Sequence, residues 1–317
     1  MNTLTSYSLS TLEELKRELD GTRALIQNTA LQSLPSQHHQ DWELLGLGES
    51  PSLLEQCQQL LSATVDPDIN TIRTVHHFAC TGGTLISKAI AALPSTYLLS
   101  ELHPHSPIRK TEKTFAPSDL ALLAHAAQMP NASELAERIM AASILEAHKW
   151  ASAFGGQLVL RDHTHSDFCV GEKPNPGSVI NRLCDQTFDQ RLSLITVRHP
   201  FDSWLSLTKN GWVHFQPGDF DEYCKRYHAF LDDLEGHPIV RYEDFTASPA
   251  ETLDTICEAL QLPTSDTAEF TFALFRLSGD SGRTATRIGG RTRQGADQNV
   301  PFSTAYQPLL ARLGYEE

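Results

Sequence analysis

The sequence has no long apolar run and few positive charges. No stretch approaches the ~18 consecutive apolar residues of a membrane-spanning helix, so no membrane span is expected. Lysine and arginine number 25 against 39 aspartates and glutamates, giving a net charge of −14. This acidic balance argues against a nucleic acid partner. The first residues lack the basic and apolar regions of a secretory signal, so we expect a cytoplasmic protein.

Recognisable metal-binding patterns are also missing. The six cysteines include no CxxC pair, and their long spacings suit neither a zinc knuckle nor a dense disulfide framework. Four histidines fall in two short clusters, at positions His103, His105, His163 and His165. An HExxH motif is absent, and the spacing of these histidines matches no common zinc site. We therefore expect no metal.

The first 70 residues are predicted to form a helical extension. Thr11 and Glu14 make a capping-box pattern, and Leu12, Leu15 and Leu19 follow on one helix face. No residue in this segment suggests chemistry. Its helices are a candidate surface for a homo-oligomer.

From residue 71 to residue 317 the pattern predicts one α/β domain. Short apolar strands are predicted over residues 74–78, 97–99, 157–160, 192–197 and 238–242. Helical patterns separate them, including a helical insert over 111–154. This alternation predicts a three-layer fold with a central, mostly parallel sheet of about five strands. Ligands of such sheets bind beyond the C-terminal ends of the strands.

The first motif at such a strand end is FACTGGTL, residues 78–85. Gly82 and Gly83 let the backbone approach an anion, and the helix that follows offers free N–H groups at its positive end. Thr81 and Thr84 add hydroxyl groups. The Walker A pattern is absent. An ordinary tight turn between strand and helix explains the same residues equally well.

The second motif is TVRHPFDSWLS, residues 196–206. A predicted strand ends near Arg198, Pro200 begins a helix, and Ser206 follows two turns later. The planar guanidinium of Arg198 suits a phosphate, and the Ser206 hydroxyl can reach the same group. The alternative is that Arg198 pairs with Asp202 while Ser206 faces solvent.

Together the two motifs resemble those of the sulfotransferase family, whose fold is related to P-loop kinases. In that family a [KR]-[SG]-G-[ST]-T loop binds the 5′-phosphosulfate end of 3′-phosphoadenosine-5′-phosphosulfate (PAPS), and an R-x7-S element binds its 3′-phosphate. RYEDFTASP, residues 241–249, resembles a further family segment with a mainly structural role. The resemblance covers about residues 72–262. It implies a P-loop-like fold and sulfuryl transfer from PAPS to the hydroxyl of a small-molecule or carbohydrate acceptor.

The resemblance also implies which residues bind the donor. A stretch rich in arginine and glycine near the C-terminus is similar to the family's third contact with the 3′-phosphate. With it, the implied cofactor-binding residues are Cys80, Thr81, Gly82, Gly83, Thr84, Leu85, Arg198, Ser206, Arg283 and Arg287.

One position departs from the family pattern. The family's loop opens with a lysine or arginine that stabilises charge during transfer, and the aligned residue here is Cys80. Candidate replacements are His76, His77, Lys88 and Arg161. His76 and His77 are neighbours on a strand and point to opposite faces, so at most one approaches the loop.

The acceptor needs a general base. Glu101 lies where some family members carry a catalytic glutamate, so the resemblance implies that Glu101 is the base. His163, after the third predicted strand, is a second catalytic candidate that orients the acceptor or takes its proton. His77 is the third, as a possible replacement for the missing cation.

Two other functions remain open at this stage. A kinase-like phosphotransferase on the same fold would need magnesium and a P-loop lysine, which the sequence lacks. A non-catalytic member that only binds the 3′-phosphoadenosine nucleotide would explain Cys80.

Overall fold

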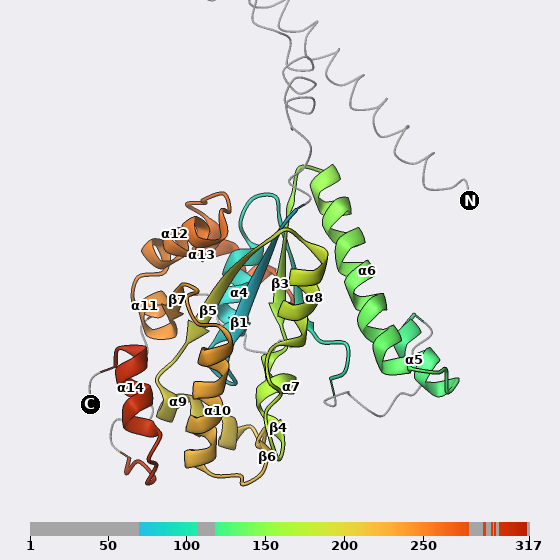
Figure 1. Cartoon of the computed structure of the whole chain (residues 1–317). Helices are drawn as coiled ribbons and strands as arrows, with labels where there is room; N and C mark the ends of the chain where they lie inside the picture. The colour runs from blue at the N-terminus through green and yellow to red at the C-terminus, as the bar shows by residue number, and fades with distance from the viewer. Residues whose placement is uncertain are drawn as a thin grey trace, which may run out of the picture. The chain divides into compact units, whose positions relative to one another are not determined.

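The computed structural model describes residues 70–106, 118–278, 288–289, 293, 295 and 298–315. At its centre is a five-stranded parallel sheet with the spatial order β2-β3-β1-β5-β7 (Figure 1). Its strands are β1 (Thr71–His77), β2 (Thr96–Leu102), β3 (Gln157–Asp162), β5 (Gln190–Val197) and β7 (Ile239–Arg241). Two short parallel strands, β4 (Val170–Gly171) and β6 (His214–Phe215), pair separately. All five predicted strands, and the three-layer α/β fold, are confirmed.

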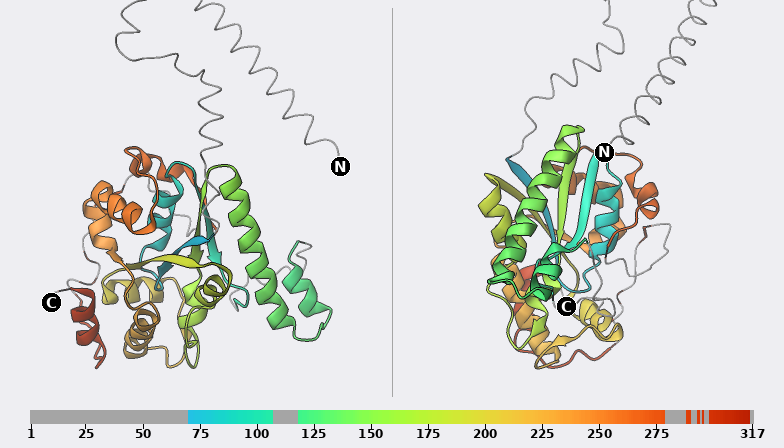
Figure 2. Two further views of the ribbon diagram at one scale, coloured as in Figure 1. Left: turned by 45° about the horizontal axis from the view of Figure 1, so that its top comes forward. Right: turned by 90° about the vertical axis from the view of Figure 1, so that its right-hand side faces the viewer.

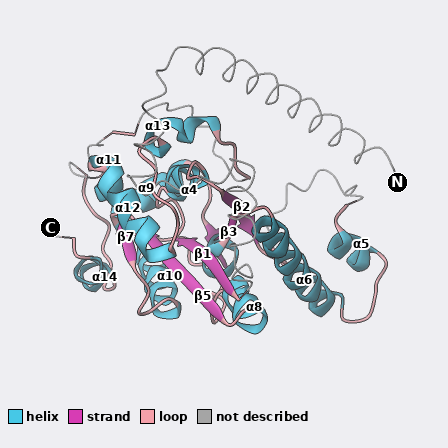
Figure 3. Cartoon of the chain, turned by 90° about the horizontal axis from the view of Figure 1, so that it is seen from above, coloured by secondary structure: helices cyan, strands magenta, loops and turns pink. Residues whose placement is uncertain are grey.

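Helices cover both faces of this sheet, as the view from above shows (Figure 3). On one face α4 (Gly83–Ala91) and α12 (Pro249–Leu260) pack against Val75 and Leu194 of the sheet. On the other face α6 (Ala132–Ala153) and α8 (Val179–Thr187) pack against Ile72 and Leu160. The alternation of apolar residues along each buried strand supplies both cores.

A third core lies just past the C-terminal ends of the strands. It is formed by α9 (Pro200–Lys209), α10 (Phe220–Asp233) and α14 (Tyr306–Leu313). Phe78, the first residue after β1, stacks on Tyr227 with ring centroids 4.3 Å apart. This aromatic packing fixes the segments that leave β1 and β5, which are the two segments that carry the sequence motifs.

The predicted insert contains two helices in its described part. α5 (Leu120–Ala126) packs against α6, and α6 packs against β3 (Figure 2). The predicted break at 129–131 falls between the two helices. Within the described residues, every helix is too short or too polar to cross a bilayer. The extension predicted for residues 1–70 lies outside the described residues apart from Asn70.

The helices not yet named are all short. They are α7 (Thr164–Phe168), α11 (Tyr242–Ala247), α13 (Ala268–Thr271) and the 3-10 helix η1 (Phe272–Leu274). In the sequence, Ser248 and Glu251 have the spacing of a capping box before α12, but no such cap forms. Ser248 ends α11 and begins α12, and its side chain makes no capping hydrogen bond. Its backbone N–H is bonded to the carbonyl of Asp244, so the end of α11 sets its conformation.

Arg226 on α10 is a buried charge that holds the β4 segment in place. Its side chain is 1% exposed and forms an ion pair with Glu222 at 2.7 Å. The guanidinium also donates hydrogen bonds to four backbone carbonyls, those of residues 168, 170, 171 and 172. Four charge-assisted hydrogen bonds from one buried guanidinium thus stabilise a segment with little regular structure.

We predict that Arg226→Met lowers the free energy of unfolding by about 3 kcal/mol or more, because it leaves Glu222 and several carbonyls without their partner. Arg312→Met is the matched control, since the Arg312–Asp232 ion pair is largely exposed and should contribute less than about 1 kcal/mol. Urea denaturation of both variants measures the difference. Equal losses of unfolding free energy would show that the buried arginine stabilises the fold no more than the exposed one.

Candidate functional site

The two sequence motifs meet at one edge of the sheet. β1 lies between β3 and β5, so the loop after β1 is flanked by the ends of both neighbours. The guanidinium of Arg198, after β5, donates to the carbonyl of Cys80 over 3.5 Å. It also lies over the ring of Tyr242, 5.2 Å from the centroid. The loop and the arginine therefore line one site.

The loop ends in an uncapped helix. Gly82 is the residue before α4 and has a left-handed backbone with φ +86°. Within the described residues no side chain caps this helix end, and its first turn carries no acidic residue. The first N–H groups of α4 have no carbonyl of their own helix to bind. Such a helix end is a setting suited to an anion.

Close packing fixes the course of this loop. A Cβ on Gly82 would lie 2.1 Å from the Tyr242 ring, and one on Gly83 would lie 2.3 Å from the His77 ring. The Thr81 hydroxyl, predicted as a ligand donor, is turned inward and donates to the carbonyl of Phe78. The loop backbone therefore has little room to rearrange.

Asn210, the residue that ends α9, lies near the loop. Ser206 lies one turn earlier on the same face of the helix and is largely buried. The amide of Asn210 lies 4.0 Å from the sulfur of Cys80. Asp202, considered above as a partner for Arg198, accepts the backbone N–H of Gly295 instead.

His76 and His77 point to opposite faces of the sheet, as the alternation predicts. The His76 ring contacts Asp162 at 3.1 Å and Thr74 at 2.9 Å, away from the loop. The His77 ring lies beneath Gly83, with its two nitrogens near the hydroxyls of Thr196 and Ser87. Burial, helped by the positive charge of Arg161, lowers the pKa of His77 well below its usual value. His77 is therefore neutral and positions the loop from below.

Glu101, His163 and Arg161 come together beside the loop. A register shift in β2 between Ser100 and Leu102 turns Glu101 out of the strand, with φ +64°. Its carboxylate forms an ion pair with Arg161 at 2.7 Å and lies 3.5 Å from Nε2 of His163. Arg161 also donates to the Thr84 hydroxyl over 3.4 Å. One guanidinium thus joins the candidate base to the loop.

The titration of these groups suits a proton acceptor. Burial raises the pKa of Glu101 above its usual value, and Arg161 opposes that shift. Burial also lowers the pKa of His163 to about 4, with the charge of His103 acting in the same direction. His163 is therefore neutral near pH 7, and its Nδ1 lies 2.9 Å from the Ser166 hydroxyl.

The other clustered histidines have partners of their own. His103 lies 3.0 Å from Asp167, His105 lies 3.0 Å from Glu137, and His165 lies 2.9 Å from His214. Among the residues that the structure describes, no group of three or more metal-ligating side chains is arranged to hold a metal ion.

The C-terminal arginine stretch is described only in part. Arg283 and Arg287 lie outside the described residues. Before them, the carbonyl of Ser278 accepts a hydrogen bond from Ser100, next to Glu101. After them, Arg293 lies 3.4 Å from Nδ1 of His199, next to Arg198. Both described ends of the stretch therefore reach the edge of the sheet that carries the site.

The RYED segment anchors this edge. The carboxylate of Glu243 accepts the backbone N–H of His199 over 3.1 Å and the Tyr315 hydroxyl over 2.7 Å. Arg241 pairs with Asp244. Sequence reasoning gave the acidic pair a structural role but missed Tyr242, which packs between Gly82 and Arg198. The signal in the sequence was an aromatic residue at the end of a predicted strand.

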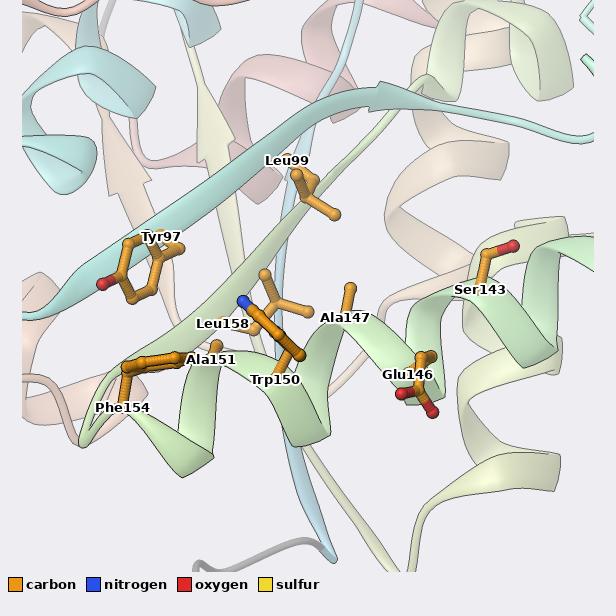
Figure 4. Close-up of a pocket in the computed structure, with 9 residues that line it drawn as sticks. All are labelled: Tyr97, Leu99, Ser143, Glu146, Ala147, Trp150, Ala151, Phe154 and Leu158. Carbon is orange, nitrogen blue, oxygen red and sulfur yellow. The ribbon is translucent and has the colours of Figure 1, made fainter. Parts of the chain in front are cut away.

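A separate hollow lies between the edge strand β2 and helix α6 (Figure 4). Its volume is about 610 Å³. It is lined by Tyr97, Leu99, Ser143, Glu146, Ala147, Trp150, Ala151, Phe154 and Leu158. These residues include none of the loop, arginine or glutamate side chains described above, so this hollow is distinct from the candidate site.

Comparisons with known proteins bear on the fold and the family of the chain. No curated protein matches the chain. Among solved structures, the sulfotransferase domain of the Synechococcus PCC 7002 olefin synthase is similar, with TM-score 0.55 and 17% identity over 78% of this chain and 96% of that domain. The sulfotransferase domain from the curacin biosynthetic pathway gives TM-score 0.52 and 16% identity over 78% of this chain and 98% of that domain. At such identities these likenesses establish the fold.

The family follows from the sequence model. The model of the sulfotransferase family matches residues 78–266, which is more than half of the chain and contains the loop, Glu101, Arg161, Arg198 and Ser206. The chain belongs to the sulfotransferase family.

Proposed function

We propose that this protein transfers a sulfuryl group from PAPS to a hydroxyl group of a small-molecule or carbohydrate acceptor. The observation that carries the proposal is the meeting of the loop, Arg198 and Glu101 at one edge of the sheet. Arg198 and the uncapped end of α4 are two groups that can each bind an anion, and a doubly phosphorylated nucleotide presents two.

In the proposed reaction the donor lies across the strand ends. The backbone of Gly82, Gly83 and Thr84 holds its 5′ end, and Arg198 with Ser206 holds the 3′-phosphate. The acceptor oxygen attacks sulfur, and the bond between sulfur and the 5′-phosphate oxygen breaks. Glu101 takes the proton of the acceptor hydroxyl. The products are a sulfate ester and adenosine 3′,5′-bisphosphate.

His163 has a supporting part in this proposal. Its neutral ring is held by Ser166 on one nitrogen and faces Glu101 with the other. The ring can therefore orient the carboxylate or pass on the proton that it receives. The proposed reaction needs no metal, because arginine side chains supply the positive charge that binds the donor.

We expect Arg198→Ala to weaken binding of adenosine 3′,5′-bisphosphate by about 2 kcal/mol, because a buried phosphate loses a charged partner. Calorimetric titration measures the change, with ATP and magnesium as the comparison ligand. Arg191→Ala is the matched control, since Arg191 lies near the start of β5, at the opposite end from Arg198, and pairs with Asp185. Unchanged bisphosphate affinity in the Arg198 variant would remove the assignment.

The loop itself can be tested at Gly82. Alanine there combines a left-handed φ with a Cβ only 2.1 Å from a carbon of the Tyr242 ring, so the loop or the ring must move. We expect Gly82→Ala to lower bisphosphate affinity at least about tenfold, since the loop N–H groups lose their alignment. Gly155→Ala has a similar φ of +70° but meets no atom within 4 Å, and should leave affinity unchanged. If both variants bind alike, the loop does not hold the nucleotide.

Glu101→Gln tests the base. The glutamine cannot accept the proton, so transfer should slow by about a hundredfold to ten-thousandfold while bisphosphate affinity stays the same. In the unsubstituted protein the rate should rise with pH as Glu101 loses its proton, with a midpoint above the usual glutamate pKa because burial raises it. Hydrolysis of PAPS, with water as acceptor, provides the rate. A variant that keeps the full rate would exclude Glu101 as the base.

A second candidate function rests on Cys80. The thiol offers no positive charge at the position where the family carries one, which would suit a member that binds the nucleotide without transferring sulfuryl. Tight bisphosphate binding with no release of sulfate from PAPS, and none with any alcohol tried, would favour this function.

A further inference from the structure

The position of Cys80 is the starting point. This residue opens the loop, has a backbone φ of +64°, and packs its side chain against the aromatic core below and near Asn210. A neutral thiol cannot stabilise the charge that builds on the sulfuryl and bridging oxygens. If the proposed function holds, the positive charge must come from another element.

Four residues were candidates to supply it. His76 faces Asp162 on the other side of the sheet, and His77 is neutral beneath the loop. Lys88 lies a full turn beyond Thr84 on α4, with its side chain buried. Arg161 is a permanent cation whose guanidinium reaches the loop, 3.4 Å from the Thr84 hydroxyl.

The sheet places Arg161 where a replacement is needed. In the parallel register it lies opposite Val75 of β1 on one side and Ser100 of β2 on the other. Its guanidinium accordingly contacts Ser100 at 3.1 Å, Glu101 at 2.7 Å and Thr84. The residue is 7% exposed, so water screens its charge weakly.

We propose that Arg161 is the catalytic cation of this protein, and that it contacts the sulfuryl group in place of the lysine or arginine that Cys80 replaces. The inference rests on the proposed function. As the acceptor oxygen bonds to sulfur and the bond from sulfur to the 5′-phosphate oxygen breaks, negative charge builds on the oxygens beside Thr84. The guanidinium stabilises that charge, and Glu101, held by the same guanidinium, receives the acceptor proton.

Sharing one guanidinium has a consequence for the base. Before the donor binds, Glu101 neutralises Arg161, which makes a buried positive charge tolerable. A sulfuryl group placed beside Thr84 competes for the same donor N–H groups and weakens the hold on the carboxylate. Glu101 then becomes a stronger base when the donor is bound. Transfer is therefore favoured when PAPS binds before the acceptor gives up its proton.

The test compares two ligands that differ only in the sulfuryl group. Arg161→Gln should weaken binding of PAPS about tenfold or more, and binding of adenosine 3′,5′-bisphosphate much less, because the bisphosphate lacks the group that Arg161 contacts. Calorimetric titration measures both affinities without an acceptor. Arg161→Lys keeps the charge and should retain part of the preference for PAPS. Lys88→Met should leave the preference unchanged.

A double variant distinguishes this role from a merely structural one. Restoring a cation at the family's position, with Cys80→Lys in the Arg161→Gln background, should recover the preference for PAPS and part of the rate of PAPS hydrolysis. Circular dichroism and thermal melting show whether each variant folds. Should the single variant unfold, Arg161→Lys compared with the unsubstituted protein still measures the change in preference.

The outcomes separate the two proposals. If the unsubstituted protein binds neither ligand, the proposed function fails. If it binds both and Arg161→Gln loses equal affinity for each, or none, Arg161 does not contact the sulfuryl group. If Lys88→Met instead abolishes the preference for PAPS, the cation is Lys88 and the assignment to Arg161 is overturned.

Discussion

The parallel register of three strands is the constraint on which this site depends. β3, β1 and β5 lie side by side, so Arg161, the Cys80–Thr84 loop and Arg198 all emerge at the same edge. Because the strands run in one direction, their C-terminal ends are level, and residues more than a hundred positions apart come within hydrogen-bond distance. A shift of one residue in any of these pairings would turn its charged side chain to the opposite face.

Burial then makes these charges effective. The chain carries a net charge of −14, yet Arg161 and Arg198 are each 7% exposed at one sheet edge. A local positive site in an acidic protein attracts an anion only over short distances, where neighbouring side chains and not the distant surface set the field. Each arginine is balanced differently before a ligand arrives. Arg161 pairs with Glu101, whereas Arg198 lies over an aromatic ring and against a backbone carbonyl.

The sequence predicted the strands and the two motifs because both depend on local patterns. Apolar runs and the glycines at 82 and 83 are visible without knowing what lies nearby. The contact of Arg161 with Thr84, and the packing of Tyr242 on Gly82, depend on pairings across the sheet that no spacing reveals. The same holds for Arg226, whose four carbonyl partners belong to a segment without a clear pattern. Ser248 does not cap α12 with its side chain, because α11, which the sequence pattern did not predict, ends at the same residue.

The replacement of a loop cation by a cysteine need not remove activity, because the charge and the backbone cradle are separate requirements. The cradle needs glycine, a left-handed turn and an uncapped helix, and all three are present at Gly82 and α4. The charge needs only a guanidinium or ammonium at the right distance, and a neighbouring strand can supply it as well as the loop can. In the proposed arrangement the cation comes from β3 and is joined to Glu101 by their ion pair. In a fold of parallel strands, the cationic residue can therefore be carried by either of two neighbouring strands, because both end at the same edge of the sheet.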